Sequence, residues 1–60
     1  MIGKIFKYEK TGKEYTVVGY AKMKDPMTRK WLDSVIYTNG DLVFVREKQE
    51  FSERFKECHE

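Results

Sequence analysis

The residues best able to do chemistry in this chain are the basic side chains that precede its single tryptophan. Lys22, Lys24, Arg29 and Lys30 fall in one nine-residue stretch, and Trp31 follows directly. In nucleic-acid and nucleotide sites, basic groups meet the phosphates and aromatic rings stack on the bases. The pattern therefore predicts a contact surface for an anionic ligand, although a solvated loop leading into a core tryptophan would have the same sequence.

A second candidate is the pair Asp33 and Arg46, which a β-hairpin between them would place opposite each other. As an exposed cross-strand ion pair, the two would contribute about 0.2–1 kcal/mol to stability. Alternatively, Asp33 orients the Arg46 guanidinium, whose two parallel donors recognise phosphate or carboxylate. Both interpretations put polar chemistry at the open end of that hairpin, next to the basic stretch.

Reactive motifs are missing from the sequence. There is no Ser-His-Asp constellation and no glycine-rich phosphate loop, and the one histidine, His59, is second from the end. Cys58 beside it has no further Cys-His cluster with which to complete the four ligands of a structural zinc site. We therefore expect a protein that is not an enzyme and that uses no cofactor or metal.

The composition predicts one small soluble domain spanning residues 1–60. The lone cysteine offers no internal disulfide, and a chain of this size buries only about 60% of the surface that its unfolded form exposes. Nine aromatic residues compensate, because each ring buries on the order of 150–250 Å². No apolar run approaches the roughly 20 residues of a membrane helix. The start of the chain is too short and too charged for a signal peptide, so we expect a cytoplasmic protein.

The net charge of +2 is unevenly distributed along the chain. Residues 1–31 carry eight lysines and arginines against three acidic residues, for +5, whereas residues 32–60 carry four against seven, for −3. Such a charge distribution steers anionic ligands toward one end of a molecule. It also permits self-association, including a homodimer.

The element that must position the candidate residues is a hairpin. Two β-prone runs, 31–38 and 41–46, meet across Asn39 and Gly40, the strongest short-range hairpin signal. We expect a two-residue type I′ turn, in which Asn39 and Gly40 both take positive φ. Side chains alternate across a strand, so this turn predicts two faces, both apolar near the turn. One face holds Asp33, Val35, Tyr37, Leu42, Phe44 and Arg46, and the other holds Leu32, Ser34, Ile36, Val43 and Val45.

This register pairs Thr38 with Asp41 at the turn and Asp33 with Arg46 at the open end. Because both faces are apolar, we expect one to be core. The other should be covered by the segment after the hairpin or by a second subunit.

The segment 47–58 has helical periodicity. Phe51, Phe55 and Cys58 recur at i, i+4 and i+7 and share one stripe. No Ser, Thr, Asp or Asn precedes Glu47 as an N-cap, so the helix must depend on docking its two phenylalanines on the sheet. Alternatively, the same stripe binds a partner.

Two earlier strands complete the expected fold. Residues 3–8 and 13–23 alternate as strands do, with a turn at 9–12, and Gly19 predicts a bulge or bend in the second. The fold class that follows is mainly β with a C-terminal helix: a small curved four-stranded antiparallel sheet or an SH3-like partial barrel.

The chain resembles a known family in the order of its aromatic and glycine residues. The matching features are Phe6-Lys7-Tyr8, the run from Thr11 to Tyr15, Val17 to Ala21, Val35-Ile36-Tyr37 and Phe44-Val45-Arg46, followed by Phe51. Over residues 3–51 they are similar to domain of unknown function 1653, found in bacteria and phages. The family has histidines where this chain has Lys7 and Met23, a longer segment between Tyr37 and Leu42, and a proline at Glu47. The resemblance implies a compact β domain in which Arg46, beside Tyr37 and Phe44, is the best matched polar position for a ligand site.

These observations predict a small non-enzymatic binding module, an accessory protein of a phage or bacterium that contacts a host or partner protein. A short chain that begins with its own Met is typical of phage accessory proteins. The alternative is an anion binder, either a nucleotide-sequestering or a weak nucleic-acid-binding protein, that uses the basic loop 22–30 and Arg46. The candidate contact residues are Lys22, Lys24, Arg29, Lys30, Trp31, Asp33, Tyr37 and Arg46.

Overall fold

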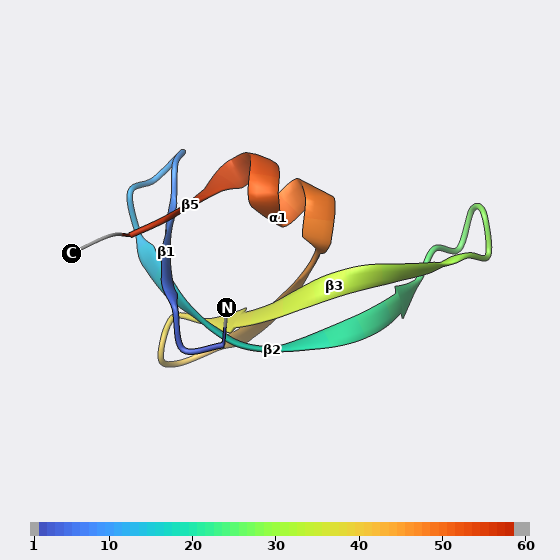
Figure 1. Ribbon diagram of the computed structural model, residues 1–60, viewed down its shortest axis with the longest axis horizontal. Coiled ribbons are helices and arrows are strands. Elements are labelled where there is room, and N and C mark those ends of the chain that lie inside the picture. Colours follow the sequence, from blue (N-terminus) through green and yellow to red (C-terminus); the bar gives the residue numbers. More distant parts are fainter. Residues whose placement is uncertain (1, 59–60) are drawn as a thin grey trace.

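The computed structural model describes residues 2–58, which form one antiparallel sheet and a single short helix (Figure 1). The sheet has five strands in the order β4-β3-β2-β1-β5 and does not close into a barrel. This confirms the predicted curved antiparallel sheet with a helix near the C-terminus, with one strand more than the four expected. The elements are β1 (Ile5–Tyr8), β2 (Glu14–Lys24), β3 (Trp31–Thr38), β4 (Val43–Glu47), α1 (Lys48–Arg54) and β5 (Phe55–Glu57).

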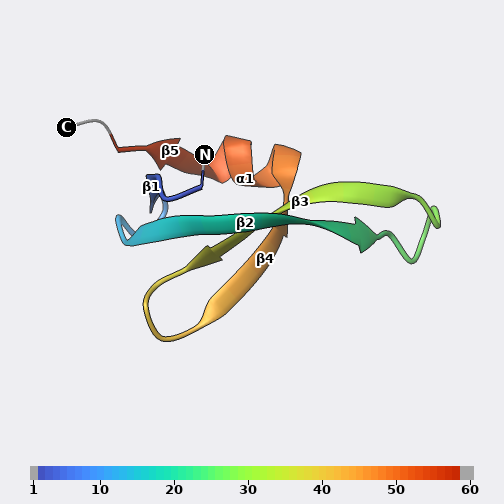
Figure 2. The ribbon, with the colours of Figure 1, turned by 60° about the horizontal axis from the view of Figure 1, so that its bottom comes forward.

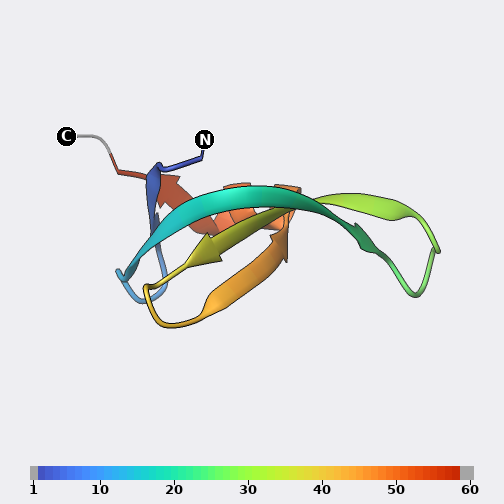
Figure 3. The same ribbon diagram turned by 90° about the horizontal axis from the view of Figure 1, so that it is seen from below.

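The core lies between the helix and the inner side of the curved sheet. Figure 3 views the molecule from below, with the sheet in front of α1. The Phe51 ring lies 5.1 Å from that of Phe6 and 5.2 Å from that of Tyr37, centroid to centroid. These aromatic contacts let a small core bury large apolar areas. The buried apolar residues are Phe6, Val17, Val35, Tyr37, Phe51 and Phe55.

The helix is shorter than the sequence predicts. It ends at Arg54, because Phe55 takes an extended conformation (φ −119°, ψ 143°) and pairs with Tyr8 of β1. This pairing gives backbone partners to an edge of β1 that a longer helix would leave bare. Phe55 still stacks on Phe51 and both rings are buried. The docking prediction is therefore confirmed, and the alternative of an exposed partner-binding stripe is wrong.

Glu47 itself caps the helix, which the sequence prediction missed. Its carboxylate accepts hydrogen bonds from the backbone N–H groups of Gln49, at 2.6 Å, and Glu50, at 3.3 Å. A carboxylate at this end also interacts favourably with the helix dipole. The expectation of a poor N-cap was therefore wrong, because Glu47 takes the place of the usual short capping residue.

The register of the β3–β4 hairpin differs from the predicted one by two residues. Tyr37 pairs with Phe44 and Val35 with Arg46, so a four-residue loop, 39–42, replaces the two-residue turn. Gly40 has a positive φ of 103° but Asn39 does not, which excludes type I′. Instead, the Asn39 side chain accepts hydrogen bonds from the N–H groups of residues 41 and 42, as such side chains do in turns.

A shift of two residues leaves the predicted faces of the strands intact, because the side-chain period of a strand is also two. Val35 and Tyr37, which the sequence puts on one face, are buried, so this face is the core side. On the other face Val43 and Val45 are exposed. The expectation that the helix covers this second face was wrong, because α1 lies against the core side.

Gly19 marks an irregularity, as predicted. The pairing between β2 and β3 shifts between Val17 and Gly19, which leaves Val18 as the extra residue of a β-bulge. Beyond this point the two strands continue together to Lys24 and Trp31, the ends of the longest strand pair in the sheet.

Replacing Phe51 with alanine should lower the free energy of unfolding by about 3–5 kcal/mol, because it removes a buried ring from the small core. Urea unfolding followed by circular dichroism measures the change. The matched control is Leu42→Ala in the exposed loop 39–42, where we expect less than about 0.5 kcal/mol. Equal effects of the two substitutions would show that the helix does not dock in solution.

Candidate functional site

The outer parts of β2 and β3 form a two-stranded ribbon that projects from the body of the protein (Figure 1). We define the ribbon as residues 20–35; it contributes to the elongated shape of 38 × 19 × 19 Å. Lys22 pairs with Asp33 across it, and Lys24 pairs with Trp31. Opposite residues of an antiparallel pair share a face, so these four side chains lie together on what we call the Trp31 face.

The loop at the tip of the ribbon is fixed by its own hydrogen bonds. The Asp25 carboxylate accepts from the N–H of Met27 at 2.9 Å, and the Asp25 N–H donates to the Lys30 carbonyl at 2.8 Å. Pro26, with its preset φ, suits the turn between them. Arg29 has a φ of 61°, in the left-handed region. Arg29 and Lys30 thus occupy this exposed tip, beside the Trp31 face.

Trp31 is exposed, and it does not close the core as one interpretation of the sequence proposed. Its relative exposure is 64%, and the Lys24 Nζ lies 5.8 Å from the ring centroid. A cation over an exposed indole contributes about 0.5–1 kcal/mol. The pair keeps a large flat ring and a positive charge together at the surface.

Lys22 and Asp33 form an ion pair on the same face. The hydrogen bond from Lys22, and then its charge, hold the pKa of Asp33 below its usual 3.8, with a smaller contribution from the charge of Lys48. Both side chains are mostly exposed. Asp33 thus keeps its negative charge at neutral pH and offsets one of the ribbon's cations.

Arg46 and Tyr37 lie apart from the ribbon residues. Val35, and not Asp33, is the cross-strand partner of Arg46. Its Nε donates to the Tyr37 hydroxyl at 3.2 Å, and this hydrogen bond is the main reason that the Arg46 pKa is raised. The predicted Asp33–Arg46 pair is therefore wrong, because the two-residue register shift moves Arg46 away from Asp33.

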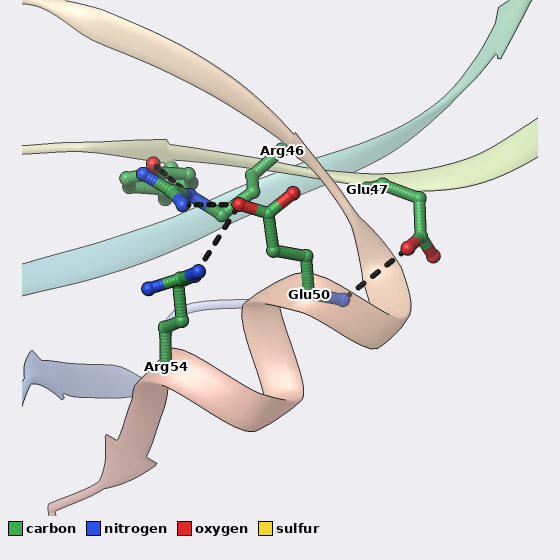
Figure 4. A network of polar contacts seen from close by, with 5 residues as sticks. Arg46, Glu47, Glu50 and Arg54 are labelled. Atoms are coloured by element: carbon green, nitrogen blue, oxygen red, sulfur yellow. Dashed lines mark hydrogen bonds and ion pairs between the residues drawn. The ribbon is translucent and has the colours of Figure 1, made fainter. Parts of the chain in front are cut away.

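Glu50 is the acidic partner of Arg46. Figure 4 shows the Glu50 carboxylate between two arginines; it accepts a hydrogen bond from Arg46 Nη1 at 2.8 Å and forms an ion pair with Arg54 Nε at 3.4 Å. All three residues follow one another at four-residue spacing. That spacing is the sequence signal by which the network could have been found.

The candidate residues therefore fall into two groups. The structure brings Lys22, Lys24, Trp31 and Asp33 together on one face, with Arg29 and Lys30 at the tip, whereas Tyr37 and Arg46 contact the aromatic residues of the body. Along β3, Trp31 is four residues from Val35, the partner of Arg46, which corresponds to about 13 Å of strand.

An open groove at the base of the ribbon was not foreseen. It has a volume of about 450 Å³ and runs between the start of β3 and the first turn of α1. Lys48 adds a further cation here, close enough to affect Asp33. The tertiary fold alone brings these segments together, so local sequence patterns gave no sign of the groove. Its lining residues are Trp31, Leu32, Asp33, Glu47, Lys48, Gln49 and Ser52.

Within residues 2–58, no group of three or more His, Cys, Asp or Glu side chains is arranged to hold a metal ion. His59, which follows Cys58 in the sequence, lies outside the described residues. In the same range there is no helix with the length and apolar character needed to cross a membrane.

The Asp33 carboxyl should titrate below pH 3.8, and Lys22→Gln should raise its pKa toward that value. A carboxyl whose pKa is depressed by folding stabilises the fold above the unfolded pKa. This contribution disappears as the pH falls through the folded pKa. A ¹³C NMR titration of the carboxyl carbon measures both effects, with Lys24→Gln as the control that leaves Asp33 unchanged. An unaltered Asp33 midpoint in Lys22→Gln would mean that the pair does not form in solution.

Comparison with known proteins adds no relative. No family model, no curated protein and no solved structure gives a significant match to the chain. The resemblance to domain of unknown function 1653 thus stays a prediction that rests on the residues alone.

Proposed function

We propose that this protein is a non-enzymatic binding module that contacts a partner protein through the Trp31 face of its ribbon. The observation that carries the proposal is the exposed Trp31 ring beside Lys24, on a ribbon that extends beyond the core. Tryptophan is enriched among the residues that dominate protein interfaces. A small domain gains stability by burying its rings, so an exposed one suits a contact with another molecule better than it suits the fold.

The neighbouring side chains support a protein partner. Tyr20 is also exposed, and Met27 at the tip has a relative exposure of 89%. Tyrosine and methionine are both enriched in protein interfaces, and methionine adapts its flexible side chain to irregular surfaces. The ribbon therefore combines rigid rings with adaptable apolar contacts.

The charge of the ribbon indicates what the partner surface carries. Four cations and two carboxylates give residues 20–35 a net charge of +2. Asp33 offsets Lys22, which leaves Lys24, Arg29 and Lys30 to meet negative charge. Complementary charge speeds association and selects among partners. We therefore expect an acidic surface on the partner protein.

The alternative function is binding of a nucleotide or nucleic acid. The contact between Lys24 and Trp31 favours it, because a cation beside an exposed ring suits a base and its phosphate. Two observations favour a protein instead. Asp25 and Asp33 add negative charge to the ribbon, and Arg46, a member of the proposed anion site, pairs with Glu50 away from the loop.

Further parts of the proposal rest on the sequence. They are the absence of catalysis, a cytoplasmic location, and an origin as an accessory protein of a phage or bacterium. The missing reactive motifs, the charged composition and the resemblance to domain of unknown function 1653 support them.

Trp31→Ala should weaken partner binding by about 2 kcal/mol or more, as for a central interface residue. The protein is immobilised and incubated with bacterial lysate, and a captured protein is identified by mass spectrometry, purified and titrated against both forms by calorimetry. Leu42→Ala is the matched control: at 61%, Leu42 is about as exposed as Trp31. Its loop joins β3 to β4, at the opposite end of the molecule from the ribbon tip (Figure 2). Full affinity is expected for this control.

Nuclease treatment of the lysate separates the two functions. A contact with protein survives nuclease, whereas capture that disappears, with an affinity that falls steeply as salt rises, assigns the ribbon to nucleic acid. Equal affinity of Trp31→Ala and the unchanged protein would contradict the proposed contact surface in either case.

A further inference from the structure

Arg46 lies at a small pocket that is otherwise lined by aromatic rings. The rings are one from each strand of the sheet, in the order β1 to β5: Tyr8, Tyr15, Tyr37, Phe44 and Phe55. Strands β4 and β5 are the two edges of the sheet. The pocket therefore lies where the sheet curls round and brings its edges toward each other without closing.

The size of the pocket limits what it accepts. Its volume is about 120 Å³, somewhat less than the roughly 150 Å³ of an apolar cavity that holds benzene. The pocket also opens to solvent, so a ligand need not fit entirely inside. One six-membered ring or a short branched chain fits the site, whereas a whole nucleotide does not.

The charge at the pocket favours an anion. The Arg46 guanidinium carbon lies 5.7 Å from the ring centroids of both Tyr8 and Phe55, which fixes the group over aromatic surface. Arg46 and Arg54 share Glu50 as their acidic partner, so this network keeps one unit of positive charge. A cationic ligand would be repelled.

Hydrogen-bond donors remain available beside this charge. Nε and Nη1 of Arg46 have partners, but within residues 2–58 Nη2 has none, and neither have the hydroxyls of Tyr8 and Tyr15. A carboxylate accepts several hydrogen bonds at once, and those from a guanidinium are short and strong. Rings that would hold an apolar group and donors that would hold a carboxylate thus belong to the same pocket.

We propose that this pocket binds an apolar carboxylate, with its ring or branched chain against the aromatic side chains and its carboxylate on Arg46. Two sources carry this chemistry: a free small organic acid, or the C-terminal residue of a peptide with an apolar side chain. The site is separate from the ribbon and does not depend on the function proposed for it.

Titration with phenylacetate tests the proposal, followed by ¹H–¹⁵N NMR of the backbone and of the Arg46 Nε–H group. We expect saturable shifts that map to the pocket. Phenylacetamide, which has the same shape without the charge, and acetate, which lacks the ring, should each bind about tenfold more weakly or worse. Equal binding of the acid and the amide, or shifts confined to the ribbon, would overturn the proposal.

Arg46→Gln should weaken phenylacetate binding about tenfold or more. Lys4→Gln is the matched control for the loss of one positive charge, because Lys4 is exposed, lies outside the Glu50 network and does not line this pocket, and it should leave the affinity unchanged. If Arg46→Gln fails to fold, Arg46→Lys replaces it. This variant keeps the charge but loses the guanidinium Nη2 donor that is available to a carboxylate, and it should bind several-fold more weakly. Unchanged affinity in the folded Arg46 variant would refute the site.

A peptide that ends in phenylalanine identifies the source of the ligand. Tighter binding of N-acetyl-Ala-Ala-Phe than of phenylacetate supports the proposal and assigns the pocket to a protein C-terminus. Tighter binding of phenylacetate supports it and assigns the pocket to a small acid. Binding of neither compound overturns it.

Discussion

The parallel rings of Phe51 and Phe55, 4.3 Å apart, hold the C-terminal part of the chain against the sheet. A seven-residue helix has too few turns to be stable alone, so α1 depends on this contact and on the Phe51–Tyr37 contact beneath it. The same stacking places Phe55 next to β1, where Phe55–Glu57 forms the fifth strand of the sheet. The helix and the added strand therefore depend on one small aromatic cluster without a disulfide.

A core of this size cannot cover everything that the sheet presents. The outer half of the β2–β3 pair extends past the aromatic cluster, and for that reason Trp31 stays in solvent. Arg46 is held differently, because its guanidinium lies on rings at the margin of the core and pairs with Glu50. The two groups of candidate residues thus differ in how they are held. The first lies on the ribbon, which makes few contacts with the body, and the second is fixed by the packing of the body.

The sequence predicted the features that depend on periodicity. The alternation of 31–38 and 41–46 predicted which side chains share a face, and the structure shows that the face with Val35 and Tyr37 is the core. The spacing of Phe51 and Phe55 identified the docking stripe. The features that depend on particular side-chain hydrogen bonds were not predictable. The Asn39 side chain sets the loop length and hence the register, and Glu47 caps the helix. The helix boundary failed for a related reason, since a tertiary pairing with Tyr8 overrode the local pattern at Phe55.

For the candidate site too, position along the sequence was predictable, whereas contacts set by the tertiary structure were not. Lys22, Lys24 and Trp31 were grouped because they are close in the sequence, as parts of a basic loop and the residue after it. The structure does bring them together, but on paired strands, because β2 continues to Lys24. Placing Arg46 among its neighbours required the correct register of the β3–β4 hairpin, and the predicted register differed from it by two residues. The neighbours Tyr8, Phe55 and Glu50 were therefore not predicted.

The ribbon has a consequence for how such a protein can change through evolution. Its tip contacts little of the body, so insertions in the ribbon leave the core undisturbed. One residue added to each strand between Trp31 and the body would turn Trp31 to the opposite face, whereas two in each would restore its direction and carry the tip about 7 Å further out. The length of the ribbon can thus change in steps of two residue pairs without changing the direction of Trp31. Such changes would alter which surface the ribbon contacts, while the aromatic core stayed the same.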